Sequence, residues 1–221
     1  MEKRKLLIGT YDTAIEGLWT LSGWGLEDPA LIESYIDVPG RIDGPLDAST
    51  ALTDGDARYG ARAFEAILER SEGTRLEREA RISAMVNQLD GRRFDIVLPD
   101  DPTHHIRGRV RVAKLFNNLA HGSVKVTATC EPWRYNNADT VVGLTATATE
   151  QTVTLLNTGR RAVAPLVQVI GGTVNLTFGT SRWALSAGTH PLPDLFLPQG
   201  AHPLTYSGSG TVLLTYREAV L

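Results

Sequence analysis

The densest group of chemically capable side chains lies in the stretch "DDPTHH", which contains Asp100, Asp101, His104 and His105. Carboxylates and imidazoles are the ligand types of zinc and similar metal ions, so this stretch is the strongest candidate for a metal site. Neighbouring side chains of a strand point to opposite faces, however, and only one of the two histidines could join a given site. Asp-Asp-Pro is also common turn chemistry, because aspartate side chains bond the backbone of a turn. We therefore expect a turn leading into a strand, and no metal site.

Nucleophiles in this sequence lack the surroundings that would activate them. Cys130 is the only cysteine and lies in an alternating run, where it is expected to be a small buried hydrophobe. Ser207 and Ser209 belong to a Gly-Ser turn without a nucleophile-elbow signature. The glycine-rich stretch "GGTVNLTFG" enters a strand and opens no helix, which argues against a dinucleotide site. The sequence therefore predicts no catalytic residues and no cofactor.

Tryptophans raise the alternative of a carbohydrate-binding module. Trp183, in "GTSRWALSAG", is the best candidate for stacking on a sugar, and Arg182 adjoins it. No strand with a clustered His, Asn and Arg set precedes it, however. Burial is the ordinary role of such rings, because aromatic bulk dominates cores and interfaces. We expect a core role and keep sugar binding as an alternative.

Composition places the chain among ordinary globular proteins. It has 221 residues, of which 42% are apolar and 21% charged, enough to bury a sizeable core. The formal net charge of −3 argues against nucleic-acid binding, which needs clustered lysines and arginines. A single cysteine leaves no disulfide framework and suits a reducing cytoplasm. No apolar run is long enough for a signal peptide or a membrane span, so we expect a soluble protein.

The second half of the chain has the pattern of a small all-β sandwich. Only seven Lys, Arg, Asp or Glu residues follow Thr149. Short period-two runs separated by turns replace them, as in "QTVTLLNT", "GGTVNLTFG" and "SGTVLLTYRE". Polar turn residues in "YNNADTVVG" mark the change. We therefore predict a domain over residues 1–135, a linker over 136–149 and a second domain over 150–221.

The first half also indicates mostly β-structure. In "GARAFEAILER", Phe64, Ala66 and Leu68 fall on one face of a strand, and Glu65 and Glu69 on the other. Part of this stretch also fits a helical turn. The runs "HHIRGRVRVAKLF" and "GSVKVTATCEPW" alternate over a long distance and are joined by "NNLAH", which predicts a long hairpin.

One segment, "TRLEREARISAMVNQLDG", is helical. Thr74 and Glu77 can form a capping box, and Gly91 lies where a C-terminal glycine cap belongs. The sequence therefore predicts one amphipathic helix over residues 75–90 or so, packed on a β-sheet. Its apolar residues recur at i, i+3, i+4 and i+7, namely at Ile82, Met85, Val86 and Leu89.

The stretch "VPGRIDGPLD" is a stiff, charged corner. Its prolines and glycines fix a sharp change of direction. Arg41 can bind a carboxylate with two parallel hydrogen bonds, and Asp43 and Asp47 are close in sequence. Pairing within one subunit and pairing across a subunit boundary both fit this pattern. In either case the corner is a scaffold and not a reactive site.

Taken in order, these stretches resemble the distal tail protein (Dit) family of bacteriophages with long non-contractile tails. The ordered set is "YDT", "VPGRIDGPLD", "YGARAFEAIL", "MVNQLDG", "FDIVLPDDP", "IRGRV", "ATCEPWRY" and "NTGRRAVAPLVQVIGG". The resemblance covers nearly the whole chain, from Leu6 to Leu214. One departure is Ile42, which stands between Arg41 and Asp43 where the family often has Gly-Arg-Asp-Gly. The corner loop is therefore expected to be one residue longer.

The resemblance implies a fold and a structural role. The fold would be all-β with one α-helix, as an N-terminal β-sandwich-like ring domain and a C-terminal galectin-like β-sandwich. The protein would be no enzyme but a hub, a homohexameric ring at the distal end of the virion tail, assembled in the cytoplasm of the bacterial host. Its partners would be the major tail tube protein and the tail-tip or fibre protein, with the tape-measure protein as a further candidate. Neither nucleic-acid specificity nor a membrane is implied.

Charged residues of the first domain are our candidates for contacts between subunits, because complementary charges set register and orientation. Two other functions stay open beside the hub. One is a stand-alone carbohydrate-binding module, and the other is a different phage tail tube or baseplate subunit. The candidate interface residues are Arg41, Asp43, Asp47, Glu65, Glu69 and Arg109.

Overall fold

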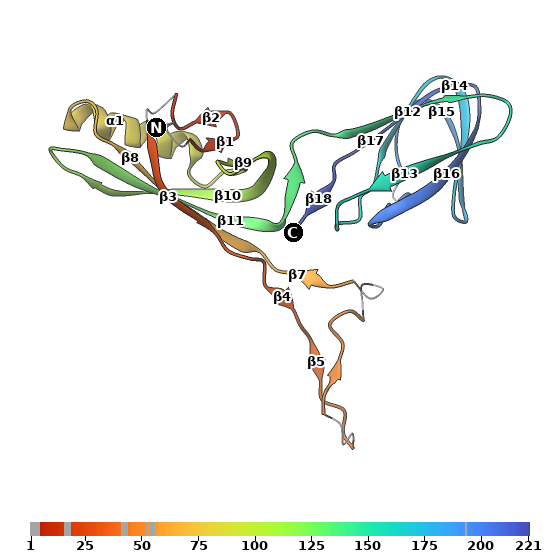
Figure 1. The fold of residues 1–221 in the computed structure, drawn as a ribbon, viewed down its shortest axis with the longest axis horizontal. Helices are drawn as coiled ribbons and strands as arrows, with labels where there is room; N and C mark the ends of the chain where they lie inside the picture. The colour runs from red at the N-terminus through yellow and green to blue at the C-terminus, as the bar shows by residue number, and fades with distance from the viewer. Residues whose placement is uncertain (1–4, 16–18, 41–43, 52, 54–55, 193) are drawn as a thin grey trace. The chain divides into compact units, whose positions relative to one another are not determined.

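The computed structural model describes residues 5–15, 19–40, 44–51, 53, 56–192 and 194–221. The chain forms two compact units, Met1–Pro132 and Trp133–Leu221. Each unit has an apolar core of its own, and strands dominate both of them (Figure 1). The predicted all-β chain with one helix is confirmed for the described residues. No helix among them is long and apolar enough to cross a membrane.

The first unit is built on one antiparallel sheet. Residues 62–70 alternate strictly, with Phe64, Ala66 and Leu68 buried and Glu65 exposed, so the strand interpretation is confirmed over the helical turn. The predicted long hairpin is also confirmed. In sheet order the strands are β2 (Tyr11–Asp12), β1 (Leu7–Ile8), β9 (Arg93–Leu98), β10 (Asp101–Asn117), β11 (Gly122–Asn136), β8 (Arg62–Arg70) and β3 (Thr20–Leu26).

Gly108, in the motif "IRGRV", allows β10 and β11 to approach closely. A Cβ atom added at this position would lie 2.5 Å from Cys130 Sγ and 2.8 Å from the carbonyl oxygen of Thr129. No side chain fits at such distances. Glycine is therefore required here by the spacing of the strands.

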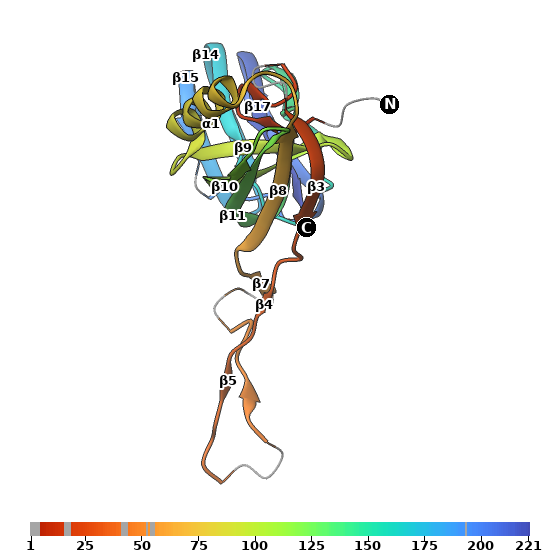
Figure 2. The same ribbon diagram turned by 90° about the vertical axis from the view of Figure 1, so that its left-hand side faces the viewer.

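Helix α1 (Arg75–Leu89) covers one face of this sheet (Figure 2). It starts with the predicted capping box: Glu77 N donates to Thr74 Oγ1 at 3.2 Å, and Thr74 N donates to Glu77 Oε2 at 2.7 Å. Gly91 follows the helix with a φ of 76°, a conformation that suits glycine. The predicted helix is confirmed. Its stripe packs into the core, with Ile82, Met85 and Leu89 buried and Val86 partly buried.

An extension leaves the sheet between β3 and β8, and we call residues 27–60 the arm. It contains two short ladders, β4 (Leu31–Ile32) with β7 (Arg58–Tyr59) and β5 (Tyr35–Ile36) with β6 (Leu46–Asp47). Figures 1 and 2 both show it as a narrow pair of chain segments. No described residue of the arm belongs to either apolar core.

The second unit is a separate antiparallel sheet whose longest strand bends in the middle. At the bend, Gly171 and Gly172 have φ angles of 70° and 68°, and the register shifts between Val169 and Thr173. This longest strand is β14 (Leu166–Phe178), which pairs with β17 (Gly210–Tyr216) before the bend and with β16 (Gly200–Gly208) after it. In sheet order the strands are β12 (Thr140–Ala146), β17 (Gly210–Tyr216), β14 (Leu166–Phe178), β16 (Gly200–Gly208) and β13 (Gln151–Asn157), with β15 (Ser181–Pro191) beside β14 and β18 (Ala219–Val220) beside the end of β11.

The segment 136–149, expected as a linker, contains a strand of the second sheet. β12 pairs with β17 from Thr140 to Ala146. Its inward residues Leu144 and Ala146 are buried in the second core. The polar residues of "NNAD" therefore form a turn before the strand, and the alternation that follows is that of the sheet.

Candidate assembly surfaces

The arm exposes apolar side chains that have no core to enter. Its two ladders are two residues per strand, and a two-stranded hairpin of any length is only marginally stable alone in water. Exposed apolar groups gathered on one segment mark an interaction site. Six side chains of the arm are between 40% and 57% exposed, namely Leu31, Ile32, Tyr35, Ile36, Val38 and Leu46.

The arm is also strongly acidic. Residues 27–60 contain eight Asp or Glu residues and two arginines. Asp47 is exposed and accepts a hydrogen bond from Ser49 N at 2.9 Å. Hydrogen bonding by Ser49 lowers the pKa of the Asp47 carboxyl, so it is ionised at neutral pH. Arg41 and Asp43 lie outside the described residues, so their predicted pairing with Asp47 stays a prediction.

The sheet of the first unit has a second face, which α1 does not cover; we call it the outer face. Residues of β10 that alternate with buried Val110 and Val112 point to it, as do those of β8 that alternate with Phe64. This face is charged where the other is apolar. It is therefore a second candidate surface for assembly.

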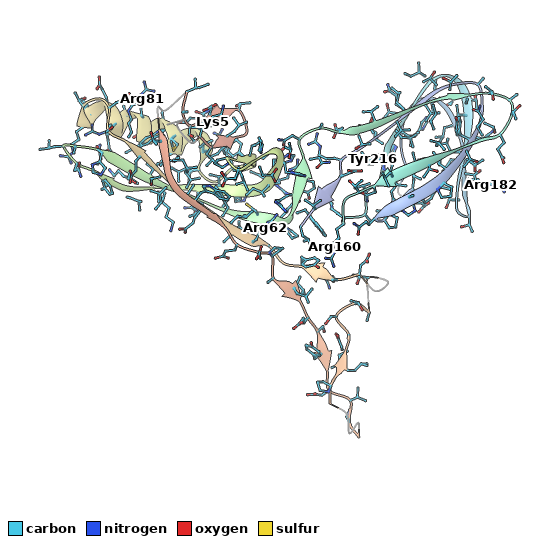
Figure 3. All side chains as sticks on the ribbon, viewed as in Figure 1. Lys5, Arg62, Arg81, Arg160, Arg182 and Tyr216 are labelled. Atoms are coloured by element: carbon cyan, nitrogen blue, oxygen red, sulfur yellow. The ribbon has the colours of Figure 1, made fainter. Side chains whose placement is uncertain are left out.

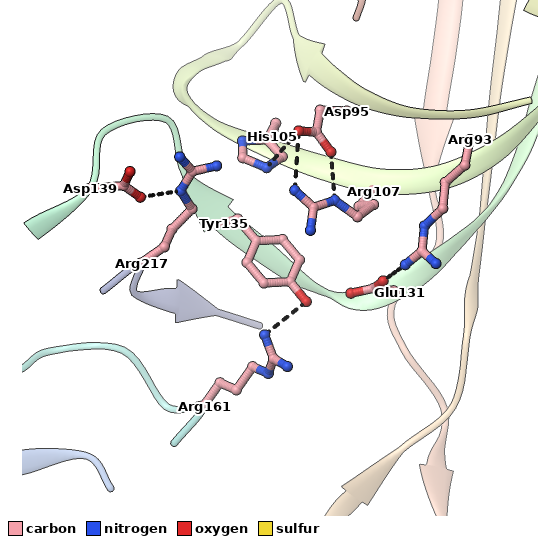
Figure 4. Close-up of polar contacts among 9 residues, drawn as sticks. All are labelled: Arg93, Asp95, His105, Arg107, Glu131, Tyr135, Asp139, Arg161 and Arg217. Atoms are coloured by element: carbon pink, nitrogen blue, oxygen red, sulfur yellow. Dashed lines mark hydrogen bonds and ion pairs between the residues drawn. The ribbon is translucent and has the colours of Figure 1, made fainter. Parts of the chain in front are cut away.

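Several charges of the outer face are already paired within the chain. Lys125 Nζ lies 2.8 Å from Glu65 Oε2. Arg107 binds Asp95 with two hydrogen bonds of 2.6 and 3.1 Å, and Arg93 pairs with Glu131 (Figure 4). These partly exposed ion pairs each contribute little to stability. They hold the side chains in place on the face.

Arg109 is different, because it makes no ion pair with any described residue. Its guanidinium donates to the carbonyl oxygen of Gly91 at 2.6 Å and is otherwise exposed. Beside it lies a shallow groove of about 450 Å³, lined by Glu65, Ala63 and Thr127 among others. The structure thus brings three predicted interface residues, Glu65, Glu69 and Arg109, to one face. Asp47 lies apart from them on the arm.

The candidate metal ligands of "DDPTHH" are directed to different partners. His104 Nδ1 lies 2.8 Å from Asp101 Oδ1, whereas His105 is buried with its Nε2 3.5 Å from Asp95 Oδ2. Within the described part of the chain, no three His, Cys, Asp or Glu residues are grouped to hold a metal ion. Asp101 begins β10, as expected of a turn that leads into a strand.

Cys130 and Trp183 both serve the cores. Cys130 is buried, and its burial raises the pKa of the thiol to about 11, so it is no thiolate at neutral pH. Trp183 is partly buried and packs against the core of the second unit. The expectation of a core role is confirmed for both residues.

Sequence analysis missed two features. Within the arm, only the corner "VPGRIDGPLD" was recognised from the sequence. The structural role of Arg78 was not predicted. Arg78 is buried on α1 and donates from NH2 to the carbonyl oxygens of Asn118 and Leu119 at 2.6 and 3.2 Å, which ties the tip of the β10–β11 hairpin to the helix. It lies four residues before Ile82, on the apolar stripe. Because Arg78 continues the apolar stripe of the helix, the sequence pattern already indicated that its side chain is buried.

Comparisons with known proteins give the fold. No protein-family model matches the chain, and no curated protein sequence matches it. The structure is similar to the crystal structure of the SPP1 Dit (gp 19.1) protein, described as a paradigm of the hub adsorption apparatus in phages that infect Gram-positive bacteria. The TM-score is 0.66 at 14% sequence identity, and the match covers 98% of this chain and 99% of that chain. The fold of a phage distal tail protein is therefore present over nearly the full length.

Proposed function

We propose that this chain is a structural hub of a phage tail tip, with six copies forming a ring that joins the tail tube to the tail-tip or fibre protein. Support comes from the full-length likeness in fold to SPP1 Dit and from the order of its sequence motifs. The described residues offer charged and apolar surfaces, and no three of the described His, Cys, Asp or Glu residues are grouped to hold a metal ion. Proteins of this kind act by assembly and not by chemistry.

The arm is the observation that carries the proposal. Its six exposed apolar side chains and its two-residue ladders need a partner surface for stability. A virion hub assembles together with further copies of itself, so a second copy of the chain is the partner we propose for the arm. The arm is acidic, and the outer face presents Arg109 and Arg111 on β10. When the arm of one copy lies on the outer face of the next copy, the acidic side chains of the arm meet these arginines.

This contact is heterologous, because the arm and the outer face are different parts of the surface. Heterologous contacts form closed rings when the rotation between copies closes. The proposed ring would use Asp47 on one side of each contact, and Arg109 on the other. Arg41, Asp43, Glu65 and Glu69 complete the candidate set.

The remaining partners follow from the proposed position in the tail. The ring would bind the major tail tube protein on one side and the tail-tip or fibre protein on the other, with the tape-measure protein as a further candidate. Its location would be the distal end of the virion tail, after assembly in the bacterial cytoplasm. We infer neither nucleic-acid specificity nor membrane insertion for it.

Native mass spectrometry and negative-stain microscopy of the full chain test this proposal. The protein is measured at high concentration and together with its tail tube protein, with and without the double substitution Tyr35→Glu, Ile36→Asp. We expect hexameric rings with the unchanged arm, and monomers with the substituted one. The matched control is Leu156→Asp, at an exposed position of the second unit. Rings that persist in the arm variant, or a monomer under all conditions, would contradict the proposal.

A further inference from the structure

The strands of the second sheet are almost free of charged residues. Arg182, on β15, is the only Lys, Arg, Asp or Glu residue on the strands β12 to β17, and Glu150 comes directly before β13. Both line the same open dish of about 430 Å³. Because the rest of this sheet is uncharged, two opposite charges around one dish are a specific feature of the surface.

The dish lies where β14, β15 and β16 run side by side. Leu176 pairs with Trp183 on one neighbouring strand and with Tyr206 on the other, and Leu176 is fully buried. The residues before and after this row point to the opposite side of the sheet, away from the core. The backbone of the row is thus the floor of the dish. Its walls are the side chains of Asn175, Thr177, Arg182, Ala184, Thr205 and Ser207.

The polar groups of the dish are free to bind a ligand. Arg182 (Figure 3), Glu150 and Asn175 are exposed. None of these three side chains forms a hydrogen bond or an ion pair with another residue that the structure describes. The guanidinium therefore keeps its donors, the carboxylate its acceptors, and the amide both.

We propose that this dish binds a neutral saccharide. Adjacent hydroxyls of a sugar ring can accept two hydrogen bonds from a guanidinium and donate two to a carboxylate, so one sugar can satisfy both Arg182 and Glu150. An anionic ligand would be repelled by Glu150. An apolar ligand would remove water from both charges without replacing its hydrogen bonds. The small wall residues Ala184 and Ser207 leave room for the ring.

Recognition in this dish rests on hydrogen bonds and not on stacking. Trp183 and Tyr206 also line the dish, but both are partly buried and pack against the core. Arg182, the neighbour of Trp183, is exposed and faces the dish. Binding of a single sugar without an aromatic platform is expected to be weak, in the millimolar range. This site is independent of the ring and of the arm.

The test uses the labelled full-length chain on an array of immobilised oligosaccharides that end in glucose, galactose or N-acetylglucosamine, with sialylated oligosaccharides as anionic comparators. The best neutral probe is then titrated in solution by NMR. Arg182→Ala and Glu150→Gln are compared with Gln168→Ala and Thr189→Ala, two exposed positions of β14 and β15 outside the dish. We expect at least one neutral probe to bind. Its affinity should fall about tenfold or more in each dish variant and stay unchanged in the controls.

Three results would overturn the proposal. The first is that no neutral probe binds. The second is that binding is unchanged by both Arg182→Ala and Glu150→Gln, which would place the site elsewhere. The third is that the unchanged chain binds the sialylated probes more tightly than every neutral probe, which would make the dish an anion site. None of these results bears on whether the chain forms rings.

Discussion

Arg78 shows how a single residue organises the first unit. Its side chain is buried at the start of α1, and its guanidinium also donates to Asn117 Oδ1 at 3.2 Å and to the carbonyl oxygen of Gly73. A buried charge is stable only when it is fully hydrogen-bonded. The helix start and the hairpin tip are therefore held as one piece by this side chain.

Replacing Arg78 with Ala should lower the free energy of unfolding by about 1–3 kcal/mol, because the backbone acceptors of the hairpin tip are left without their buried donor. Urea unfolding followed by tryptophan fluorescence measures the loss. Arg81→Ala, an exposed neighbour on the same helix, serves as the control and should change stability by no more than about 0.5 kcal/mol. Equal losses in both variants would show that burial of Arg78 is not the cause.

Glu77 should make the stability of the fold depend on pH in a known direction. The hydrogen bonds from the backbone and side chain of Thr74 lower the pKa of the Glu77 carboxyl below its ordinary value of 4.5. A lowered pKa in the folded state stabilises the fold above the unfolded pKa, and this stabilisation is lost as pH falls through the folded pKa. Glu77→Gln should therefore be less stable than the unchanged protein at pH 7. The difference should shrink as pH falls below 4.5, as thermal melts across that range would measure; a constant difference would argue against the ionised cap.

At the scale of elements, long periodic segments were predictable and short irregular ones were not. The stripe of α1 and the strict alternation of β8 carry enough residues for a period to be read. The arm has ladders of two residues, too short for any period, so only its corner "VPGRIDGPLD" was visible in the sequence. β12 was missed for another reason, because polar turn residues directly before Thr140 obscured the start of its alternation.

The candidate site was only partly predictable. The alternation of β8 and β10 could be predicted from the sequence, and it places Glu65, Glu69 and Arg109 on one face of the sheet. Their neighbours across the sheet, such as Lys125 beside Glu65, depend on strand order, which one sequence does not give. The dish around Arg182 was missed because Trp183 was the residue considered for sugar binding. Trp183 packs against the core, and its neighbour Arg182 lies on the other face of the strand. A shift of one residue changes the face of a strand, and only the register decides it.

The proposed charge pairing between the arm and the outer face would make assembly sensitive to salt. Because these groups are exposed, added salt screens them, and the ring population should fall as ionic strength rises from about 0.05 to 0.5 M. Arg109→Glu should weaken assembly further, since Arg109 has no carboxylate partner among the described residues of its own chain. Analytical ultracentrifugation measures both effects. Arg182→Glu, an equal charge change on the second unit, is the control; equal weakening by both variants would rule out a specific role for the outer face.

At the scale of the whole molecule, each unit has a core of its own. The candidate interface residues that the structure describes all lie in the first unit, on the arm or the outer face: Asp47, Glu65, Glu69 and Arg109. The second unit contains the dish and a sheet whose strands β12 to β17 have one charged residue, Arg182. We therefore expect the two halves to have separable roles, with ring formation confined to the first.

A fragment of residues 1–135 should then form rings beside the tail tube protein, and residues 150–221 should be dispensable for them. The second sheet includes β12, so a fragment that begins at 150 lacks a strand, whereas one that begins at Trp133 keeps it. Both fragments are first checked for cooperative melting, because assembly can be judged only in a folded chain. Native mass spectrometry with the tube protein should then find hexamers of the first fragment and monomers of residues 133–221. If a folded first fragment stays monomeric while the second oligomerises, the ring-forming surface lies in the second unit and our assignment of the two halves is reversed.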